Sequence, residues 1–117
     1  MTWYLRTHYE DRRRGEIRER HYFDNGEVWV VINGDRSLVC RFDPDQLETA
    51  KAAVSRAGFA DLADIPSVAA DLAVMTYRWN VTGITGTWVD AAYPRVIPDS
   101  VDALEEVLLR LEEDAEE

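Results

Sequence analysis

Two Asn-Gly pairs, Asn25-Gly26 and Asn33-Gly34, constrain the fold of this chain more than any other feature of its sequence. Asn and Gly both tolerate positive φ angles, so such a pair between β-prone segments predicts a tight hairpin turn. The residues between the pairs, Glu27 to Ile32, are mostly β-branched or aromatic, as is typical of a largely buried strand. The chain is therefore predicted to run back and forth through consecutive antiparallel strands.

Three flanking segments extend this pattern. Trp3 to Tyr9 and Glu16 to Phe23 both alternate in polarity and are separated by the polar turn Glu10 to Gly15. Ser37 to Phe42 follows the second Asn-Gly pair. Because all these connections are short, neighbouring segments should pair, which predicts a four-stranded antiparallel meander.

Asp43 and Pro44 mark the start of a helix, because Asp can cap free amides and Pro at the first helical position loses no hydrogen bond. Apolar residues recur at helical spacing as far as Ala57, and Gly58 supplies a left-handed stop. Residues 60–74, which include Pro66, are expected to form a loop with short helical turns.

A second hairpin is predicted over Thr76 to Val81 and Thr85 to Asp90, with Trp79 and Trp88 paired across it. A final helix should follow, capped by Asp99 or Ser100. Its apolar residues should face inward, and its acidic residues should form an exposed stripe. The apolar face comprises Val101, Leu104, Val107, Leu108 and Leu111, and the stripe comprises Asp102, Glu105, Glu106, Glu112 and Glu113.

These elements predict one α+β domain over residues 1–117, with residues 114–117 as a frayed acidic tail. The expected order is four strands, a helix, two strands and a helix, in an antiparallel sheet of about four to six strands. Two helices of this length are expected to pack on one face of the sheet and leave the other face open.

The charge of the chain is uneven. Its net charge is −10, and between Asp99 and Glu117 there are nine acidic residues and one arginine. The first part of the chain, through Asp43, holds eight arginines and eight acidic residues. A concentrated negative field repels nucleic acid and anionic membranes and favours basic partners.

Several classes of protein are disfavoured by what the sequence contains. The single cysteine, Cys40, lies among apolar residues and is expected to be a buried thiol. The N-terminal segment has no long apolar stretch, so we expect a cytoplasmic protein without a membrane anchor. His8 and His21 could lie in paired strands, with Glu10 or Glu19 nearby, but two histidines make an incomplete metal site. We expect no metal, no cofactor and no catalytic residues.

The candidate partner-binding residues are of three kinds: aromatic side chains, an arginine-rich hairpin tip and the acids of the last helix. Trp and Tyr contribute large contact areas to interfaces at low entropic cost. An open sheet face carrying them would suit a protein partner or a second copy of the chain. The candidates are Trp3, Tyr4, Arg12, Arg13, Arg14, Trp79, Trp88, Tyr93, Glu105, Glu106 and Glu112.

The chain from about residue 42 to 112 resembles the emfourin family of small bacterial metalloprotease inhibitors. The resemblance lies in Asp43-Pro44 with Leu47, in the run from Ala57 to Leu62, in Tyr77 to Val81, and in Ile97-Pro98 before the apolar face of the last helix. In that family the N-terminal strand leads into a glycine-rich turn, where this chain has Glu10 to Gly15. The resemblance implies a compact inhibitor of thermolysin-like peptidases with no chemistry of its own.

The sequence thus favours a non-catalytic protein-binding module, and most specifically a small cytoplasmic inhibitor of a thermolysin-like metallopeptidase. An alternative is an acidic immunity protein or antitoxin that blocks a basic nuclease toxin with the carboxylates of its last helix. A small homodimeric structural protein, joined through the open sheet face, is a further alternative.

Overall fold

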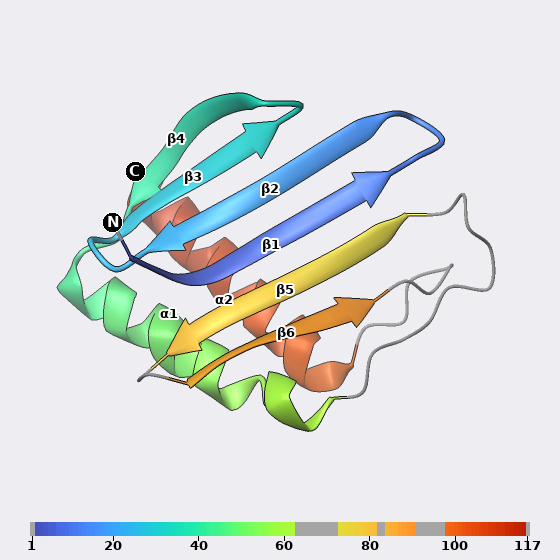
Figure 1. The fold of residues 1–117 in the computed structure, drawn as a ribbon. Coiled ribbons are helices and arrows are strands. Elements are labelled where there is room, and N and C mark those ends of the chain that lie inside the picture. The colour runs from blue at the N-terminus through green and yellow to red at the C-terminus, as the bar shows by residue number, and fades with distance from the viewer. Residues whose placement is uncertain (1, 63–72, 82–83, 91–97, 117) are drawn as a thin grey trace.

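The computed structural model describes residues 2–62, 73–81, 84–90 and 98–116. Figure 1 shows six strands and two long helices in the order that the sequence predicts. The expected loop over residues 60–74 lies mostly outside the described residues, apart from a short 3-10 turn at its start. The elements are β1 (Trp3–Asp11), β2 (Glu16–Phe23), β3 (Glu27–Ile32), β4 (Asp35–Arg41), α1 (Pro44–Arg56), the 3-10 turn η1 (Phe59–Asp61), β5 (Val74–Val81), β6 (Ile84–Asp90) and α2 (Asp99–Glu116).

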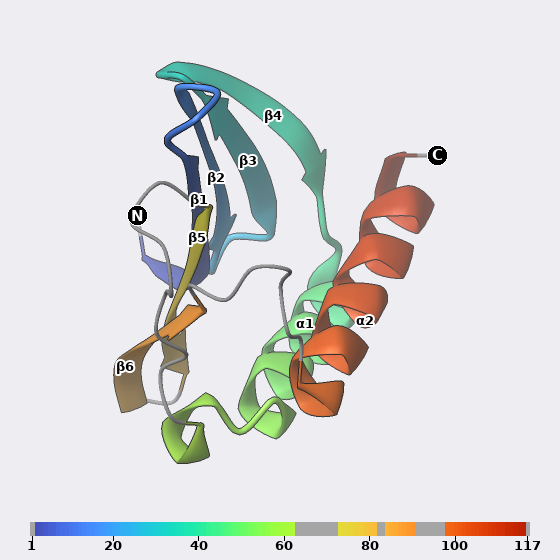
Figure 2. The same cartoon turned by 90° about the vertical axis from the view of Figure 1, so that its right-hand side faces the viewer.

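The six strands form one antiparallel sheet in the order β4-β3-β2-β1-β5-β6. The predicted meander of β1 to β4 is confirmed, and the second hairpin attaches to β1, so the N-terminal strand lies inside the sheet. Figure 2 shows α1 and α2 side by side on one face of the sheet. The predicted α+β class and the placement of both helices on one face are therefore confirmed.

Both Asn-Gly turns form where predicted, and the second has positive φ at both residues whereas the first has it at the glycine alone. Asn33 and Gly34 have φ angles of 50° and 92°, and Gly26 has a φ of 93°. Gly26 also lies close to the backbone of Phe42, the residue after β4. A Cβ added at Gly26 would fall 2.4 Å from the Phe42 carbonyl oxygen. Only glycine satisfies both conditions at position 26.

The first helix begins and ends as its sequence indicates. The Asp43 side chain accepts a hydrogen bond from the Gln46 amide at 2.8 Å, and the Gln46 side chain accepts one from the Asp43 amide at 2.9 Å. This reciprocal capping box satisfies amides that the first turn leaves free. The helix ends at Arg56, one residue earlier than predicted, and Gly58 follows with a left-handed φ of 66°.

Aromatic side chains fill the core between the helices and the β5–β6 end of the sheet. Phe59 stacks on Tyr77 and Trp79, with ring centroids 5.3 and 5.1 Å apart. The predicted pairing of Trp79 with Trp88 is wrong by two residues along the strand. Tyr77 lies opposite Trp88 instead, and Trp79 lies opposite Gly86, whose missing side chain leaves room for the indole ring.

Cys40 is buried in β4, as predicted. No helix in the described part of the chain is long and apolar enough to cross a membrane.

Candidate binding surface

Figure 2 shows both long helices on one face of the sheet, so the described helices leave the opposite face uncovered. Alternation along the strands brings to this face the even-numbered residues of β1 from Arg6 onward, the even-numbered residues of β5, the odd-numbered residues of β2 and β3, and Arg36 and Leu38 of β4. An irregularity in the β1–β2 register between Trp3 and Leu5 places Trp3 on the same face, opposite Phe23. Several apolar side chains lie here without being buried. Ile17 and Leu38 are 40% and 47% exposed, and Trp3, Trp29 and Val31 are half-buried. We call this the open face.

Two tryptophans on the open face are each covered by an arginine. The Arg6 guanidinium lies 5.5 Å from the centre of the Trp3 ring, and that of Arg36 lies 4.9 Å from the Trp29 ring. Such cation–π contacts hold large side chains in place at a surface, where each is worth about 0.5–1 kcal/mol. The open face therefore presents two ordered tryptophan–arginine pairs.

A charged cluster occupies the middle of the open face. The Glu19 carboxylate on β2 lies 3.4 Å from His8 Nδ1 and 3.5 Å from both His21 Nε2 and Arg6 Nη2. The strand register explains this convergence, because His8 lies opposite Glu19 and Arg6 lies opposite His21. The two histidines that the sequence placed in paired strands thus share one carboxylate.

The cluster alters the protonation of its members. Partial burial by itself would raise the pKa of Glu19, but the adjacent His8 and His21 side chains outweigh it and lower the pKa. Burial and the nearby positive charge of Arg6 lower the pKa of His21, against the opposing influence of Glu19. Among the residues the structure describes, no group of three or more His, Cys, Asp or Glu side chains is arranged to hold a metal ion.

Beside this cluster lies a hollow of about 300 Å³ that spans β2, β1 and β5. Its polar side chains are Arg6, His8, Glu19, Thr76 and Arg78. Arg6 and Arg78 lie directly opposite each other in the β1–β5 pair, as do His8 and Thr76. Two arginines thus face the same hollow from neighbouring strands.

The acidic stripe predicted for α2 is only partly exposed, and Glu112 corrects the prediction. Its side chain is 8% exposed, pairs with Arg20 on β2, and accepts a hydrogen bond from the Tyr22 hydroxyl at 3.2 Å. Burial and the adjacent Glu112 raise the pKa of Tyr22 well above its ordinary value. Glu105 is half-buried and hydrogen-bonded by the Tyr77 hydroxyl. The reason is geometric, because both glutamates lie on the sheet-facing side of α2 beside Leu108.

These glutamates line a second cavity, of about 340 Å³, between α2 and the sheet. Its remaining walls are mostly apolar and include Leu5, Met75 and Leu104. Each carboxylate is already engaged by side chains of the sheet, so the cavity's polar groups serve to join α2 to β2 and β5.

Most of the aromatic candidates named from the sequence are core residues. Tyr4, Trp79 and Trp88 are only 1%, 8% and 1% exposed and lie on the helix side of the sheet, so they are not available to a partner. Their high β propensity and their aromatic character do not distinguish core from interface. Tyr93 lies outside the described residues.

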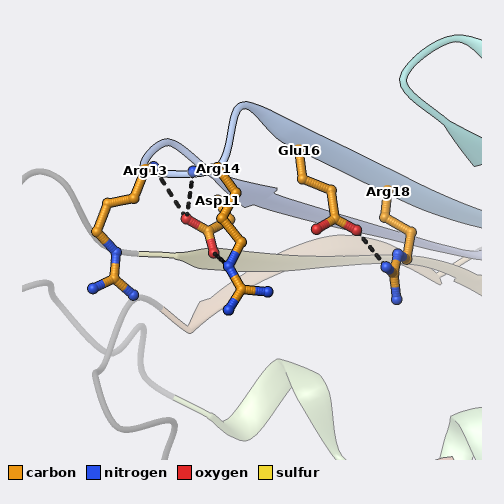
Figure 3. Close-up of polar contacts among 5 residues, drawn as sticks. All are labelled: Asp11, Arg13, Arg14, Glu16 and Arg18. Carbon is orange, nitrogen blue, oxygen red and sulfur yellow. Dashed lines mark hydrogen bonds and ion pairs between the residues drawn. The ribbon is translucent and has the colours of Figure 1, made fainter.

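The arginine-rich tip between β1 and β2 is exposed, as expected of a contact surface. Asp11 accepts hydrogen bonds from the amides of Arg13 and Arg14, at 3.1 and 3.4 Å, and so holds the turn (Figure 3). Glu16 pairs with Arg18 just beyond the turn. Arg12 to Arg14 and Glu106 are exposed, and Trp3 is half-buried on the open face.

Most residues of the open face were not among the candidates, including Arg6, Trp29, Arg36 and Arg78. The alternation of polar and apolar residues does indicate that Arg6 and Trp29 lie on opposite sides of their strands from the core residues Leu5 and Val28. The pairing of β1 with β5, which brings Arg78 beside Arg6, has no local signal in the sequence.

No family model matches this sequence, and a search of curated proteins finds no relative.

Proposed function

We propose that this protein is a non-catalytic protein-binding module whose interface is the open face of the sheet. The observation that carries the proposal is the pair of tryptophan–arginine stacks, Trp3 with Arg6 and Trp29 with Arg36, on a face that no described helix covers. Trp and Arg dominate the binding energy of protein interfaces, because each combines a large contact area with directional polar contacts.

The surroundings of these stacks fit the same role. Leu38 lies opposite Trp29 in the β3–β4 pair, and Ile17 and Val31 supply further apolar area along β2 and β3. The strands hold all of these side chains in a fixed register, so little order has to be imposed when a partner binds. Apolar side chains and arginines that flank the central charged cluster suit a partner with an apolar, acidic surface.

The narrower form of the proposal is a small cytoplasmic inhibitor of a thermolysin-like metallopeptidase. Its support is the resemblance of residues 42–112 to the emfourin family. The exposed arginine tip at residues 12–14 adjoins the open face at the end of β1 and would contribute to such a contact.

The test is to add the purified protein to a thermolysin-like peptidase that cleaves a chromogenic peptide. We expect a dose-dependent loss of peptidase activity, weakened by Trp29→Ala or Arg36→Gln on the open face. Leu109→Ala is the matched control, because Leu109 is 58% exposed on α2, away from the open face. Absence of inhibition at micromolar protein would reject the inhibitor form.

The immunity-protein alternative uses a different surface and is tested separately. It is favoured by the concentration of negative charge on α2, where Asp102, Glu106 and Glu113 are exposed. Reversing Glu106 and Glu113 to Lys should abolish salt-sensitive binding to a basic nuclease toxin while the fold stays intact. Glu112 must be left unchanged in this test, because its burial would confuse loss of binding with loss of stability.

The same open-face variants also test the homodimer alternative. If the open face joins two copies of the chain, size-exclusion chromatography should show a dimer that Trp29→Ala converts to a monomer. A monomer at all concentrations would reject that alternative.

A further inference from the structure

We propose that the hollow beside Glu19 on the open face is a carboxylate-binding site, which receives an acidic side chain or the terminal carboxylate of the protein partner. This inference rests on the proposed function for the source of the carboxylate. The donors of the site are Arg6, Arg78, His8 and Thr76, and Glu19 sets its net charge.

The first argument is the placement of like charges. Arg6 and Arg78 are directly opposite in the antiparallel β1–β5 pair, where like charges repel across a short distance. Arg6 is partly compensated by Glu19 at 3.5 Å, whereas Arg78 has no ion-pair partner among the described residues. An anion held between the two guanidinium groups would relieve this repulsion and accept hydrogen bonds from both.

The second argument is the shape and composition of the site. The hollow, of about 300 Å³, has its floor on the backbone of β1 and side chains of three strands around it. His8 and Thr76 lie opposite each other, two residues along β1 and β5 from the two arginines. Both side chains carry hydrogen-bond donors suited to an oxyanion. Rigid strands position these donors better than loops do.

The third argument selects a carboxylate over a phosphate. Glu19 borders the same hollow, so its negative charge offsets one of the two arginines. If the histidines are left aside, Arg6, Arg78 and Glu19 together carry a single positive charge, which a monoanion would balance. The Glu19 carboxylate would repel a phosphate dianion about twice as strongly as a carboxylate monoanion at the same position, because the Coulomb energy scales with the charge. The hollow is therefore a positively charged site on a chain whose net charge is −10.

The site is tested on the isolated protein, by following its backbone amide signals in NMR while sodium acetate is added at constant ionic strength. We expect saturable shifts at His8, Thr76 and Arg78, with affinity weakened about tenfold by Arg78→Gln, as for the loss of one charge-assisted hydrogen bond. Arg56→Gln, an exposed arginine on α1, is the matched control and should bind acetate as the wild type does. Tighter binding of inorganic phosphate than of acetate would overturn the assignment to a carboxylate, and shifts that Arg78→Gln leaves unchanged would overturn the site.

A second readout separates binding from a merely structural role. Since Arg78→Gln removes a like-charge contact, its Tm in low salt should equal or exceed that of the wild type, while the stabilisation by acetate is lost. A variant that is less stable than the wild type and still stabilised by acetate would contradict the proposal.

The peptidase assay then distinguishes the site from the proposed function. If acetate binds but no peptidase is inhibited, the carboxylate site stands and the inhibitor form fails. If the wild type and Arg78→Gln inhibit equally, the inhibitor form stands and the assignment of the site to the partner's carboxylate fails.

Discussion

Trp79 on β5 lies across the β-carbon position of Gly86 on β6, so that an added methyl group there would fall 2.3 Å from the indole ring. The indole cannot move aside easily, because Phe59 stacks on its other side with ring centroids 5.1 Å apart. Glycine is therefore required at position 86 for space, and its φ angle is not in the left-handed region.

Gly86→Ala should accordingly destabilise the protein, although alanine is normally the better residue in a strand. We expect a loss of about 1–3 kcal/mol, the usual cost of adding atoms to a packed core. Denaturant unfolding would measure it, with Thr87→Ala on the exposed side of the same strand as the control. A Gly86→Ala variant as stable as the wild type would show that the indole ring has room to shift.

The Arg20–Glu112 pair joins the sheet to α2, and breaking it from one side should cost more than replacing it. Arg20→Met removes the cation beside Glu112, a residue that is only 6% exposed, while the Glu112 carboxylate keeps its hydrogen bond from the Tyr22 hydroxyl. We expect a loss of about 1–3 kcal/mol, less than for a fully buried pair because the Arg20 side chain is 36% exposed.

The double variant Arg20→Met with Glu112→Met should recover much of that loss, because no unpaired charge remains buried. Thermal or denaturant unfolding of the two single variants and the double variant gives the coupling between the residues. The exposed pair of Arg110 and Glu106 is the control and should show almost none. Equal losses in the single and double variants would mean that the pair is not coupled.

Buried tyrosines should make the fold sensitive to alkali. Burial, followed by nearby negative groups, raises the pKa of Tyr4 and Tyr22 in the folded protein. Because the folded pKa exceeds the unfolded one, this contribution to stability is fully present below the ordinary tyrosine pKa of about 10 and is lost as the pH rises above it. We therefore expect the free energy of unfolding to fall above about pH 10.

The measurement is to follow tyrosinate absorbance and circular dichroism together during an alkaline titration. Part of the absorbance should appear only as the fold is lost, and Tyr4→Phe should reduce that part. Tyr4→Phe should also leave stability unchanged or slightly higher, since its buried hydroxyl has no hydrogen-bond partner among the described residues. Ionisation of all the tyrosines before any loss of structure would contradict this account.

The cap of α1 offers a test of local stability. Asp43→Ala should remove the hydrogen bond that the Asp43 carboxylate accepts from the Gln46 amide, at a cost of about 1 kcal/mol, while the backbone amide of residue 43 can still donate to the Gln46 side chain. Asp45→Ala, within the first turn, keeps the capping box and should lose less. Equal losses from the two substitutions, measured by thermal unfolding, would mean that the negative charge near the helix start matters and the cap does not.

The candidate binding surface can be predicted from the sequence only in part. The polar and apolar alternation of β1 to β3 distinguishes a core side from an outer side, which is why an open face was expected. Aromatic content does not distinguish the two sides. It therefore suggests Tyr4, Trp79 and Trp88 as interface residues, although all three are buried. Which side of a strand an aromatic residue occupies depends on where the helices lie.

The features that depend only on a few neighbouring residues can be predicted from the sequence. The turns at Gly26 and Gly34, the capping box at Asp43 and the left-handed stop at Gly58 all depend on neighbouring residues, because they arise from backbone sterics and short hydrogen bonds. The same holds for the strand and helix order, since periodicity and turn chemistry are read over a few residues at a time.

Tertiary structure alone decided the long-range pairings. The attachment of β5 to β1 brings Arg78 beside Arg6, and the position of α2 across the sheet buries Glu112 against Arg20 and Tyr22. Both contacts join residues more than seventy positions apart. They depend on how whole layers pack to bury the aromatic core, a sum over many weak contacts that no single stretch of sequence contains.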